Sequence, residues 1–242
     1  MDKPDIREKG GEHAIDGKSV RQYSDRRLFM QLLAFGACRI APGLIRALEQ
    51  AEIEGVLYAD VNDPQGVALL TWSPDPEFFA TDLRGLLQHR PFEELTLKPE
   101  YTMLGRTYAI GHEPDLDDWL IDKPRRSATE PSAPWAVWYP LRRAGSFQLL
   151  PPEELTAVLR EHSVIGHAFG SAGYAQDIRL ACAGLDKNDN DFVIGLVGRE
   201  LYPLSACVQA MRKTRQTASY IEKMGPFFVG RTLWQKLRTP KL

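Results

Sequence analysis

The segments GLIRALEQAEIEG (residues 43–55) and ELTAVLREHSVIG (residues 154–166) match one another at a constant offset of 111 positions. The matched positions are two leucines and a closing glycine: Leu44 with Leu155, Leu48 with Leu159, and Gly55 with Gly166. Leucines four residues apart predict one apolar face of a helix, and a glycine after them is typical of a helix end. The sequence is therefore a repeat, which decides the fold.

Two further matches show how far the duplication extends. VALLTWSPDPEFF from residue 67 resembles FVIGLVGRELYPL from residue 192, and LGRTY from residue 104 resembles VGRTL from residue 229, both at an offset of 125. The increase from 111 to 125 gives the second copy fourteen extra residues in its middle. Each copy predicts the order strand, helix, strand, strand, helix, strand.

This order of elements predicts the fold class. Aromatic and apolar residues place the first strands at residues 28–35 and 135–141, and the second helices fall near residues 76–87 and 201–220. A β-α-β-β-α-β unit is ferredoxin-like, with helices on one face of an antiparallel sheet. We predict an α+β fold in which two such units pack as a dimeric α+β barrel within one chain, around an internal cavity.

Composition predicts the domain boundaries. Residues 122–134, DKPRRSATEPSAP, contain three prolines and few apolar residues, which is typical of a linker. They separate an N-terminal half, residues 25–121, from a C-terminal half, residues 135–234. Residues 1–24 are charged throughout and are predicted to be a disordered tail, and residues 235–242 form a second tail.

Charge and cysteine content exclude several classes of protein. The 242 residues carry 30 Lys+Arg and 32 Asp+Glu, and a net charge of −2 provides no global field for binding nucleic acid. Neither an apolar leader nor the roughly 18 apolar residues of a membrane span is present. Cys38, Cys182 and Cys207 form no close pair, so neither disulfides nor a CxxC metal site is indicated. We expect a cytoplasmic protein.

His162 is the most informative difference between the two copies. Leu155, Val158 and His162 fall at positions i, i+3 and i+7, so the imidazole lies on the apolar face of its helix. The first copy has Ala51 at that position. The residues alone leave two interpretations open: a hydrogen-bonded core histidine, or a ligand of a metal or heme.

A second candidate group ends the first strand of the second copy. There WYPLRR, residues 138–143, brings together Tyr139, Arg142 and Arg143. Guanidinium groups pair with carboxylates in a bidentate manner, which suits a cavity mouth. The alternative is a barrel-wall aromatic residue beside solvated charges. Motifs of common hydrolases and nucleotide sites are absent from the sequence.

Taken together, YPLRR, LLPPEE, LREHSVIG, AGLDKNDNDFVIGL and GPFFVG resemble the chlorite dismutase superfamily, which includes the coproheme decarboxylases. The resemblance is specific over residues 135–231, and in the first half YTMLGRTYAIG is its most recognisable stretch. It implies that the second half binds heme and that His162 is the proximal iron ligand. The second ring nitrogen would then be held by a hydrogen-bond acceptor.

The resemblance also implies roles around the heme propionates. Tyr139 matches the redox-active tyrosine of coproheme decarboxylases, which lies beside a propionate. The family's nearby lysine is replaced, because Arg143 stands at the corresponding spacing with Arg142 next to it. An arginine binds a propionate but does not readily donate a proton, which weakens decarboxylation without excluding it.

The residues expected on the other side of the heme differ more strongly from those of the family. Chlorite dismutases carry an arginine and many decarboxylases a glutamine on the strand after the heme helix, whereas this sequence has Asp177 with Gln176 beside it. A carboxylate there repels chlorite, although Arg179 lies on the same strand face and keeps that chemistry open. Asp177 could also accept a proton from peroxide and return it to the leaving oxygen.

These observations predict a heme-dependent oxidoreductase with iron bound by His162 in heme b or coproheme. The leading hypothesis is peroxide-dependent, coproheme decarboxylase-like chemistry. The alternatives are a heme peroxidase or chlorite dismutase, a non-enzymatic heme carrier or sensor, and a barrel without cofactor. By resemblance the chain forms a ring-shaped homo-oligomer, a pentamer. The predicted catalytic residues are Tyr139, Asp177 and Gln176, and the predicted cofactor-binding residues are His162, Tyr139, Arg142, Arg143 and Arg179.

Overall fold

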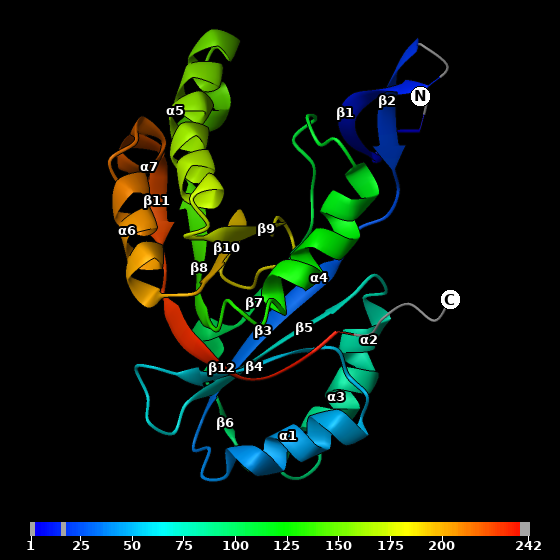
Figure 1. Ribbon diagram of the computed structural model, residues 1–242, viewed down its shortest axis with the longest axis vertical. Helices are drawn as coiled ribbons and strands as arrows, with labels where there is room; N and C mark the ends of the chain where they lie inside the picture. Colours follow the sequence, from blue (N-terminus) through cyan, green and yellow to red (C-terminus); the bar gives the residue numbers. More distant parts are fainter. Residues whose placement is uncertain (1–2, 16–17, 238–242) are drawn as a thin grey trace.

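The duplicated order of elements is confirmed in the computed structural model, which describes residues 3–15 and 18–237 (Figure 1). The first half contains β3 (Phe29–Gly36), α1 (Ala41–Gln50), β4 (Gly55–Asp60), β5 (Val67–Ser73), α2 (Glu77–Ala80), α3 (Asp82–Leu87), β6 (Thr96–Leu97) and β7 (Met103–Arg106). The second half contains β8 (Trp135–Arg143), α5 (Pro152–Ser171), β9 (Gln176–Ala181), β10 (Phe192–Gly198), α6 (Leu201–Met211), α7 (Arg215–Tyr220), β11 (Ile221–Met224) and β12 (Phe228–Lys236).

Each half orders its strands as a ferredoxin-like sheet, and the two sheets close into a barrel. The orders are β7-β3-β5-β4 and β12-β8-β10-β9, with antiparallel pairing throughout. The last strand of each half joins the second strand of the other, because β12 pairs with β4 and β7 pairs with β9. The predicted α+β fold with two ferredoxin-like repeats is confirmed.

Large side chains fill the barrel. Alternate residues of each strand point inward, and Tyr58, Trp138 and Phe228 are among the largest fully buried side chains. A Cβ atom added at Gly195 would lie 2.5 Å from the Trp138 ring. The predicted cavity inside the barrel is therefore wrong, since aromatic rings occupy this space.

Helices cover the outer faces of the two sheets unequally. In the first half α1 buries Leu44 and Leu48 completely. In the second half α6 buries Leu204 and Cys207, whereas the twenty residues of α5 bury only Val158. None of the helices in the described ranges is both long and apolar enough to cross a bilayer.

The long helix α5 does not end where the sequence predicts. It continues past Gly166 to Ser171, and Gly173 follows with a φ of +70°. A positive φ is accessible to glycine without strain, so Gly173 rather than Gly166 allows the chain to turn toward β9. Part of the fourteen-residue difference between the copies is therefore helix.

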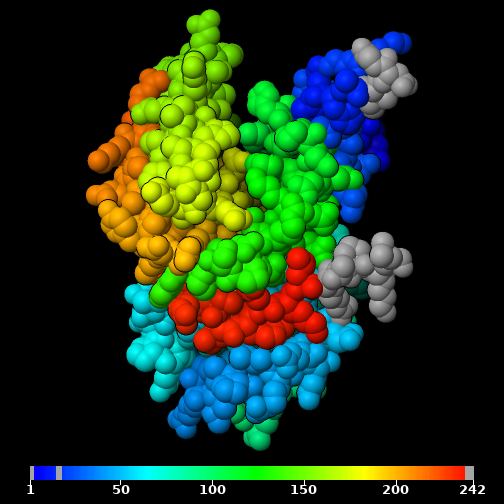
Figure 2. All heavy atoms as spheres, viewed as in Figure 1, coloured from blue at the N-terminus to red at the C-terminus, as the bar shows by residue number. Residues whose placement is uncertain are grey.

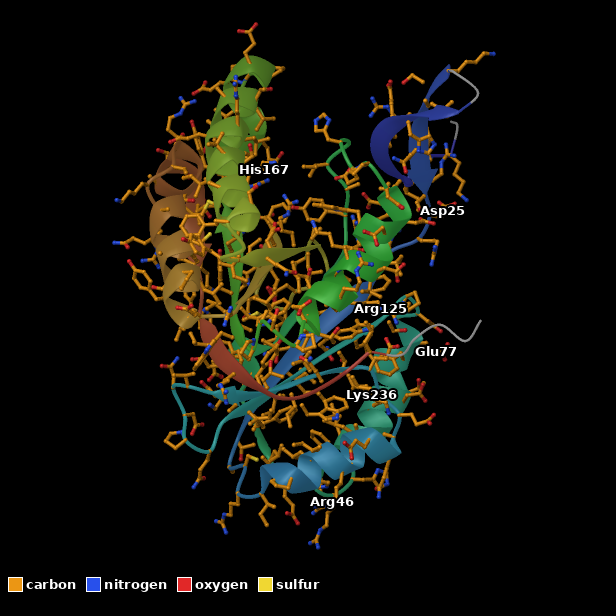
Figure 3. All side chains as sticks on the ribbon, viewed as in Figure 1. Asp25, Arg46, Glu77, Arg125, His167 and Lys236 are labelled. Carbon is orange, nitrogen blue, oxygen red and sulfur yellow. The ribbon has the colours of Figure 1, made fainter. Side chains whose placement is uncertain are left out.

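The predicted linker is helical over residues 122–128. Within residues 122–134, α4 (Lys123–Ala128) follows a π-helical turn at Asp118–Asp122. Pro124 is the second residue of α4, directly after the π-helical turn. Arg125, labelled in Figure 3, donates hydrogen bonds to both carboxylate oxygens of Glu54 at 2.9 Å. The proline content is thus compatible with a helix docked on the first half.

The predicted disordered tail is also structured where it is described. A hairpin forms from β1 (Glu8–Ile15) and β2 (Lys18–Ser24), while residues 1–2 and 16–17 lie outside the described residues. The Glu8 carboxylate pairs with Arg106 at 2.8 Å. At the other terminus, β12 includes Lys236, and residues 238–242 lie outside the description.

The contact between Gly195 and Trp138 yields a stability prediction. The Gly195→Ala variant should lower the free energy of unfolding by roughly 1–3 kcal/mol, because the new methyl group overpacks the barrel. Gly85→Ala is the matched control, since a Cβ atom added at this position of α3 would have no neighbouring side chain within 4 Å. That variant should raise stability by about 0.5–1 kcal/mol. Urea denaturation measures both, and equal midpoints would contradict this account of the core.

Candidate functional site

His162 lies on the side of α5 that faces the sheet. It is half-buried, and its Nδ1 is buried without a hydrogen-bond partner among the residues that the structure describes. Burial lowers the pKa of the imidazole, and the charges of Arg143 and Arg179 lower it further, against the opposite effects of Asp177 and Glu161. The ring is therefore neutral at pH 7, the state that ligates metals.

The next histidine on the helix has a different environment. His167, labelled in Figure 3, is exposed on α5, five residues after His162. The acceptor implied for the second ring nitrogen of His162 is not found among residues 3–15 and 18–237. Of the two histidines on α5, only His162 combines burial with an unpartnered nitrogen.

Tyr139 lies on the helix-covered face of β8. Its side chain is buried, and its ring stacks on Phe227 with centroids 4.6 Å apart. Burial raises the pKa of Tyr139 well above its ordinary value, so the hydroxyl stays protonated. The sheet register aligns Tyr139, Ile194 and Arg179 across three strands. Two strand spacings put the Tyr139 and Arg179 backbones about 10 Å apart.

Arg143 follows on the same face of β8. Its guanidinium carbon lies 4.4 Å from the ring centroid of Phe147 and 4.5 Å from that of Phe192. Burial lowers the pKa of Arg143, and its Nε is buried without a hydrogen-bond partner in the described chain. This cation, held between two aromatic rings without a carboxylate partner there, suits an incoming carboxylate.

Two predicted residues lie apart from this group. Arg142 points to the other face of β8 and pairs with Asp189 at 2.8 Å. Gln176 begins β9, where alternation places it on the opposite face from Asp177, and it is exposed. The structure therefore brings together His162, Tyr139, Arg143, Asp177 and Arg179, and separates Arg142 and Gln176 from them.

Asp177 and Arg179 form an ion pair on the outer face of β9. Arg179 Nε lies 2.9 Å from Asp177 Oδ2, and the Arg179 and Asp177 side chains are 31% and 46% exposed respectively. The Arg179 guanidinium also lies 5.1 Å from the ring centroid of Trp119. Asp177 is thus already bound to a cation, so this ion pair has to open before the carboxylate can exchange a proton with a ligand.

Sequence reasoning missed Trp119 and Lys123, which approach from the segment before the second half. Lys123 Nζ lies 3.8 Å from the Trp119 ring centroid, and the Trp119 indole donates a hydrogen bond to the Tyr108 carbonyl at 3.0 Å. The only sequence signal was a tryptophan and a lysine four residues apart on one helix face. Figure 2 shows a notch between the yellow-green surface of α5 and the green surface of the segment that leads into α4.

Glu113 holds the turn that leads to Trp119. Its buried carboxylate accepts backbone hydrogen bonds from Ile110, Gly111 and His112 at 2.6, 3.0 and 2.9 Å. The backbone carbonyl of the same residue accepts one from Gly11 of the N-terminal hairpin. The hairpin therefore supports this wall of the site.

One cavity lies beside these residues, and another lies at the C-terminal end of α5. The smaller, about 20 Å³, lies beside Lys123, Asp177 and Arg179. The larger, about 570 Å³, lies where α5 ends and α6 begins, and its wall includes Phe169 and Tyr202. His162 lines neither of these two cavities.

A family model described as chlorite dismutase matches residues 121–233, which contain all the predicted site residues. Over these residues the chain is identified with the chlorite dismutase superfamily. The match spans α4 and most of the second half, so the chlorite dismutase signature coincides with the half that carries His162.

Solved structures share the fold over both halves. A protein of Thermus thermophilus, described as a novel heme-binding protein, superposes with a TM-score of 0.65 at 19% identity, covering 86% of this chain and 91% of that chain. Chlorite dismutase from Candidatus Nitrospira defluvii, in complex with imidazole, superposes with a TM-score of 0.66 at 14% identity, covering 86% and 92%. The chlorite dismutase fold therefore includes the first half as well.

Proposed function

We propose that the chain binds heme or coproheme through His162 and uses peroxide to oxidise the bound coproheme, with loss of carbon dioxide from its propionates. The observation that carries this proposal is the neutral, half-buried imidazole of His162, which has an unpartnered nitrogen and whose pKa is lowered by the charges of Arg143 and Arg179. A neutral imidazole ligates iron, and guanidinium groups bind propionates.

The packing of α5 supports a large apolar ligand beside it. Val158 is the only buried side chain of this helix, and Leu159 remains 39% exposed one turn before His162. Covering apolar surface contributes about 25 cal/mol per Å², so a porphyrin against this helix would gain stability from the contact. The residues present therefore fit a heme.

The proposed roles follow from charge and protonation. When bound, heme supplies the iron at which peroxide is reduced. His162 would donate an imidazole lone pair to that iron, and Arg143 would bind a propionate between Phe147 and Phe192. Because Tyr139 stays protonated, its hydroxyl can release a proton together with an electron and later regain both from the substrate side chain.

The proposed reaction balances with peroxide as the oxidant. A propionate side chain loses carbon dioxide and two electrons and becomes a vinyl group. One hydrogen peroxide takes up those electrons, and with the hydrogen removed from the side chain and one proton from solvent it yields two waters. Two such rounds would remove two carbon dioxide molecules from coproheme.

Peroxidase activity toward other electron donors is the second candidate. The position of Asp177 favours it, because the carboxylate lies on the same sheet face as Tyr139 and is 46% exposed. A carboxylate there can exchange a proton with peroxide once it separates from Arg179. The homo-oligomer, a pentamer by resemblance, and the cytoplasmic location stay predictions.

Replacement of His162 tests heme binding. The purified protein should shift the Soret band of heme b or coproheme, and His162→Ala should lose that spectrum and weaken affinity at least roughly tenfold, about 1.4 kcal/mol. His167→Ala is the matched control on the same helix and should behave as the parent protein. Identical spectra for all three proteins would exclude His162 as the ligand.

The adjacent arginines provide a second matched test. Arg143→Met should weaken coproheme binding about 10- to 100-fold, the range expected for loss of a charge-assisted hydrogen bond. Arg142→Met should change affinity less than about twofold, because Arg142 is paired with Asp189 on the other strand face. Absorbance titration measures both, and equal losses would contradict the proposed propionate contact.

Tyr139→Phe separates decarboxylation from peroxidase activity. Mass spectrometry of bound coproheme after peroxide addition should show the loss of two carbon dioxide units in the parent protein and no loss in Tyr139→Phe. The Soret spectrum and dye oxidation should be largely retained, because the phenyl ring keeps the stacking on Phe227. Absence of mass loss in the parent protein would overturn the decarboxylase and leave the peroxidase.

A further inference from the structure

The larger cavity, at the junction of α5 and α6, is separate from the residues proposed to bind heme. Its volume is about 570 Å³, which falls within the roughly 300–1,000 Å³ that is typical of small-molecule sites. Its walls come from the last turn of α5, the turn before β9, and the segment that leads from β10 into α6. A small organic molecule therefore has room there.

Aromatic rings from all three segments line this cavity. Phe169 and Tyr174 form an edge-to-face pair with ring centroids 6.2 Å apart, and the Tyr174 backbone N–H donates a hydrogen bond to the Phe169 carbonyl at 3.0 Å. Tyr202 is 81% exposed and Tyr174 is 54% exposed, so the fold leaves both rings largely uncovered. Aromatic rings pack favourably on one another beyond the gain from burial alone, so these walls fit a planar aromatic ligand.

Two opposite charges lie in the same wall. Arg199 and Glu200 both line the cavity and are exposed, and no ion pair involves either of them in the described part of the chain. Glu200 would repel a carboxylate ligand, and Arg199 would repel an ammonium. A hydroxyl group can accept a hydrogen bond from the guanidinium and donate one to the carboxylate. The charges therefore fit a neutral ligand with a hydroxyl group.

We propose that this cavity binds a neutral, planar aromatic alcohol of the phenol or naphthol class. Its ring lies against Phe169, Tyr174 and Tyr202, and its hydroxyl group lies at Arg199 and Glu200. None of these residues is proposed to bind iron or a propionate, so the inference goes beyond the proposed function and does not depend on it.

Heme-free protein tests the site with 2-naphthol as the probe. The ring signals of isotope-labelled tyrosine are followed by NMR at pH 7, where 2-naphthol is neutral. Of the eight tyrosine signals, those of Tyr174 and Tyr202 should shift saturably with a Kd on the order of 1 mM. The anion 2-naphthoate and the non-aromatic cyclohexanol should each bind at least roughly fivefold more weakly, because Glu200 repels the first and the second lacks an aromatic ring.

Matched substitutions on α6 test the cavity itself. Ala206→Trp should fill the cavity and weaken naphthol binding roughly tenfold or more, because Ala206 lines it. Ser205→Trp adds the same side chain at an exposed neighbouring position outside the cavity wall and should retain binding. Tyr202→Ala should weaken binding roughly fivefold, whereas Tyr202→Phe keeps the ring and should bind as the parent protein does. Circular dichroism checks that each variant is folded.

Four results would overturn the proposal. These are an absence of saturable shifts, equal weakening in Ala206→Trp and Ser205→Trp, tighter binding of 2-naphthoate than of 2-naphthol, and shifts confined to the Tyr139 signal.

A second copy of the chain on this surface would also overturn it. In that case the Tyr174 and Tyr202 signals would depend on protein concentration without any probe, and Tyr202→Ala would sediment as a smaller species than the parent protein. Because no heme is present, failure of the naphthol titration would leave the His162 spectra unaffected. Failure of heme binding would equally leave the titration unaffected.

Discussion

Closure of the barrel at two seams is the constraint on which the rest of the structure depends. At one seam β12 meets β4, where a Cβ atom at Gly230 would lie 2.8 Å from the Tyr58 Cβ. At the other β7 meets β9, where a Cβ atom at Gly105 would lie 2.7 Å from the Leu180 Cβ. Both glycines belong to the repeated motif LGRTY and VGRTL. The duplicated motif thus supplies the close approach at both seams, where the four edges of the two sheets are paired.

The two halves share one fold but differ in how closely their first helices pack on the outer faces of the sheets. In the first half, Leu44 and Leu48 of α1 are buried against the sheet. The equivalent residues of α5 are not, because Leu155 is half-buried and Leu159 is 39% exposed. A helix held partly off its sheet leaves apolar surface and room for a ligand, which is why the candidate site belongs to the second half. His162 lies on this helix, whereas the first copy has Ala51.

The repeat made most of the fold predictable, because alternation and helical spacing are local signals that survive in one sequence. The hairpin of β1 and β2 was not predictable, since its polar residues are ordered by partners far along the chain, as Glu8 is by Arg106. For the same reason α4 was interpreted as a linker, although Arg125 binds Glu54 across 71 positions.

In the candidate site, too, local sequence patterns predicted some residues, whereas residues defined by contacts distant in the sequence were missed. Helical periodicity placed His162 on the apolar face of its helix, and the composition of WYPLRR grouped Tyr139 with both arginines. This grouping did not separate Arg142 from Arg143, although a period of two along β8 puts adjacent residues on opposite faces. Periodicity could not identify Trp119, because its contact in the site is with Arg179 of β9, which is distant in the sequence.

The distribution of charge links the site to its proposed chemistry. The whole chain has a net charge of −2, yet the charges acting on His162 include the guanidinium groups of Arg143 and Arg179. Lys123 lines the same small cavity as Arg179. Cations near a half-buried imidazole disfavour its protonation, so the ring is kept ready for a metal. Arg143 has no carboxylate partner among the residues described, whereas Arg179 is neutralised by Asp177. In the proposed function, an anionic porphyrin would therefore be oriented by Arg143, which forms no ion pair among the described residues although the charge of Asp191 acts on it, rather than by the overall charge.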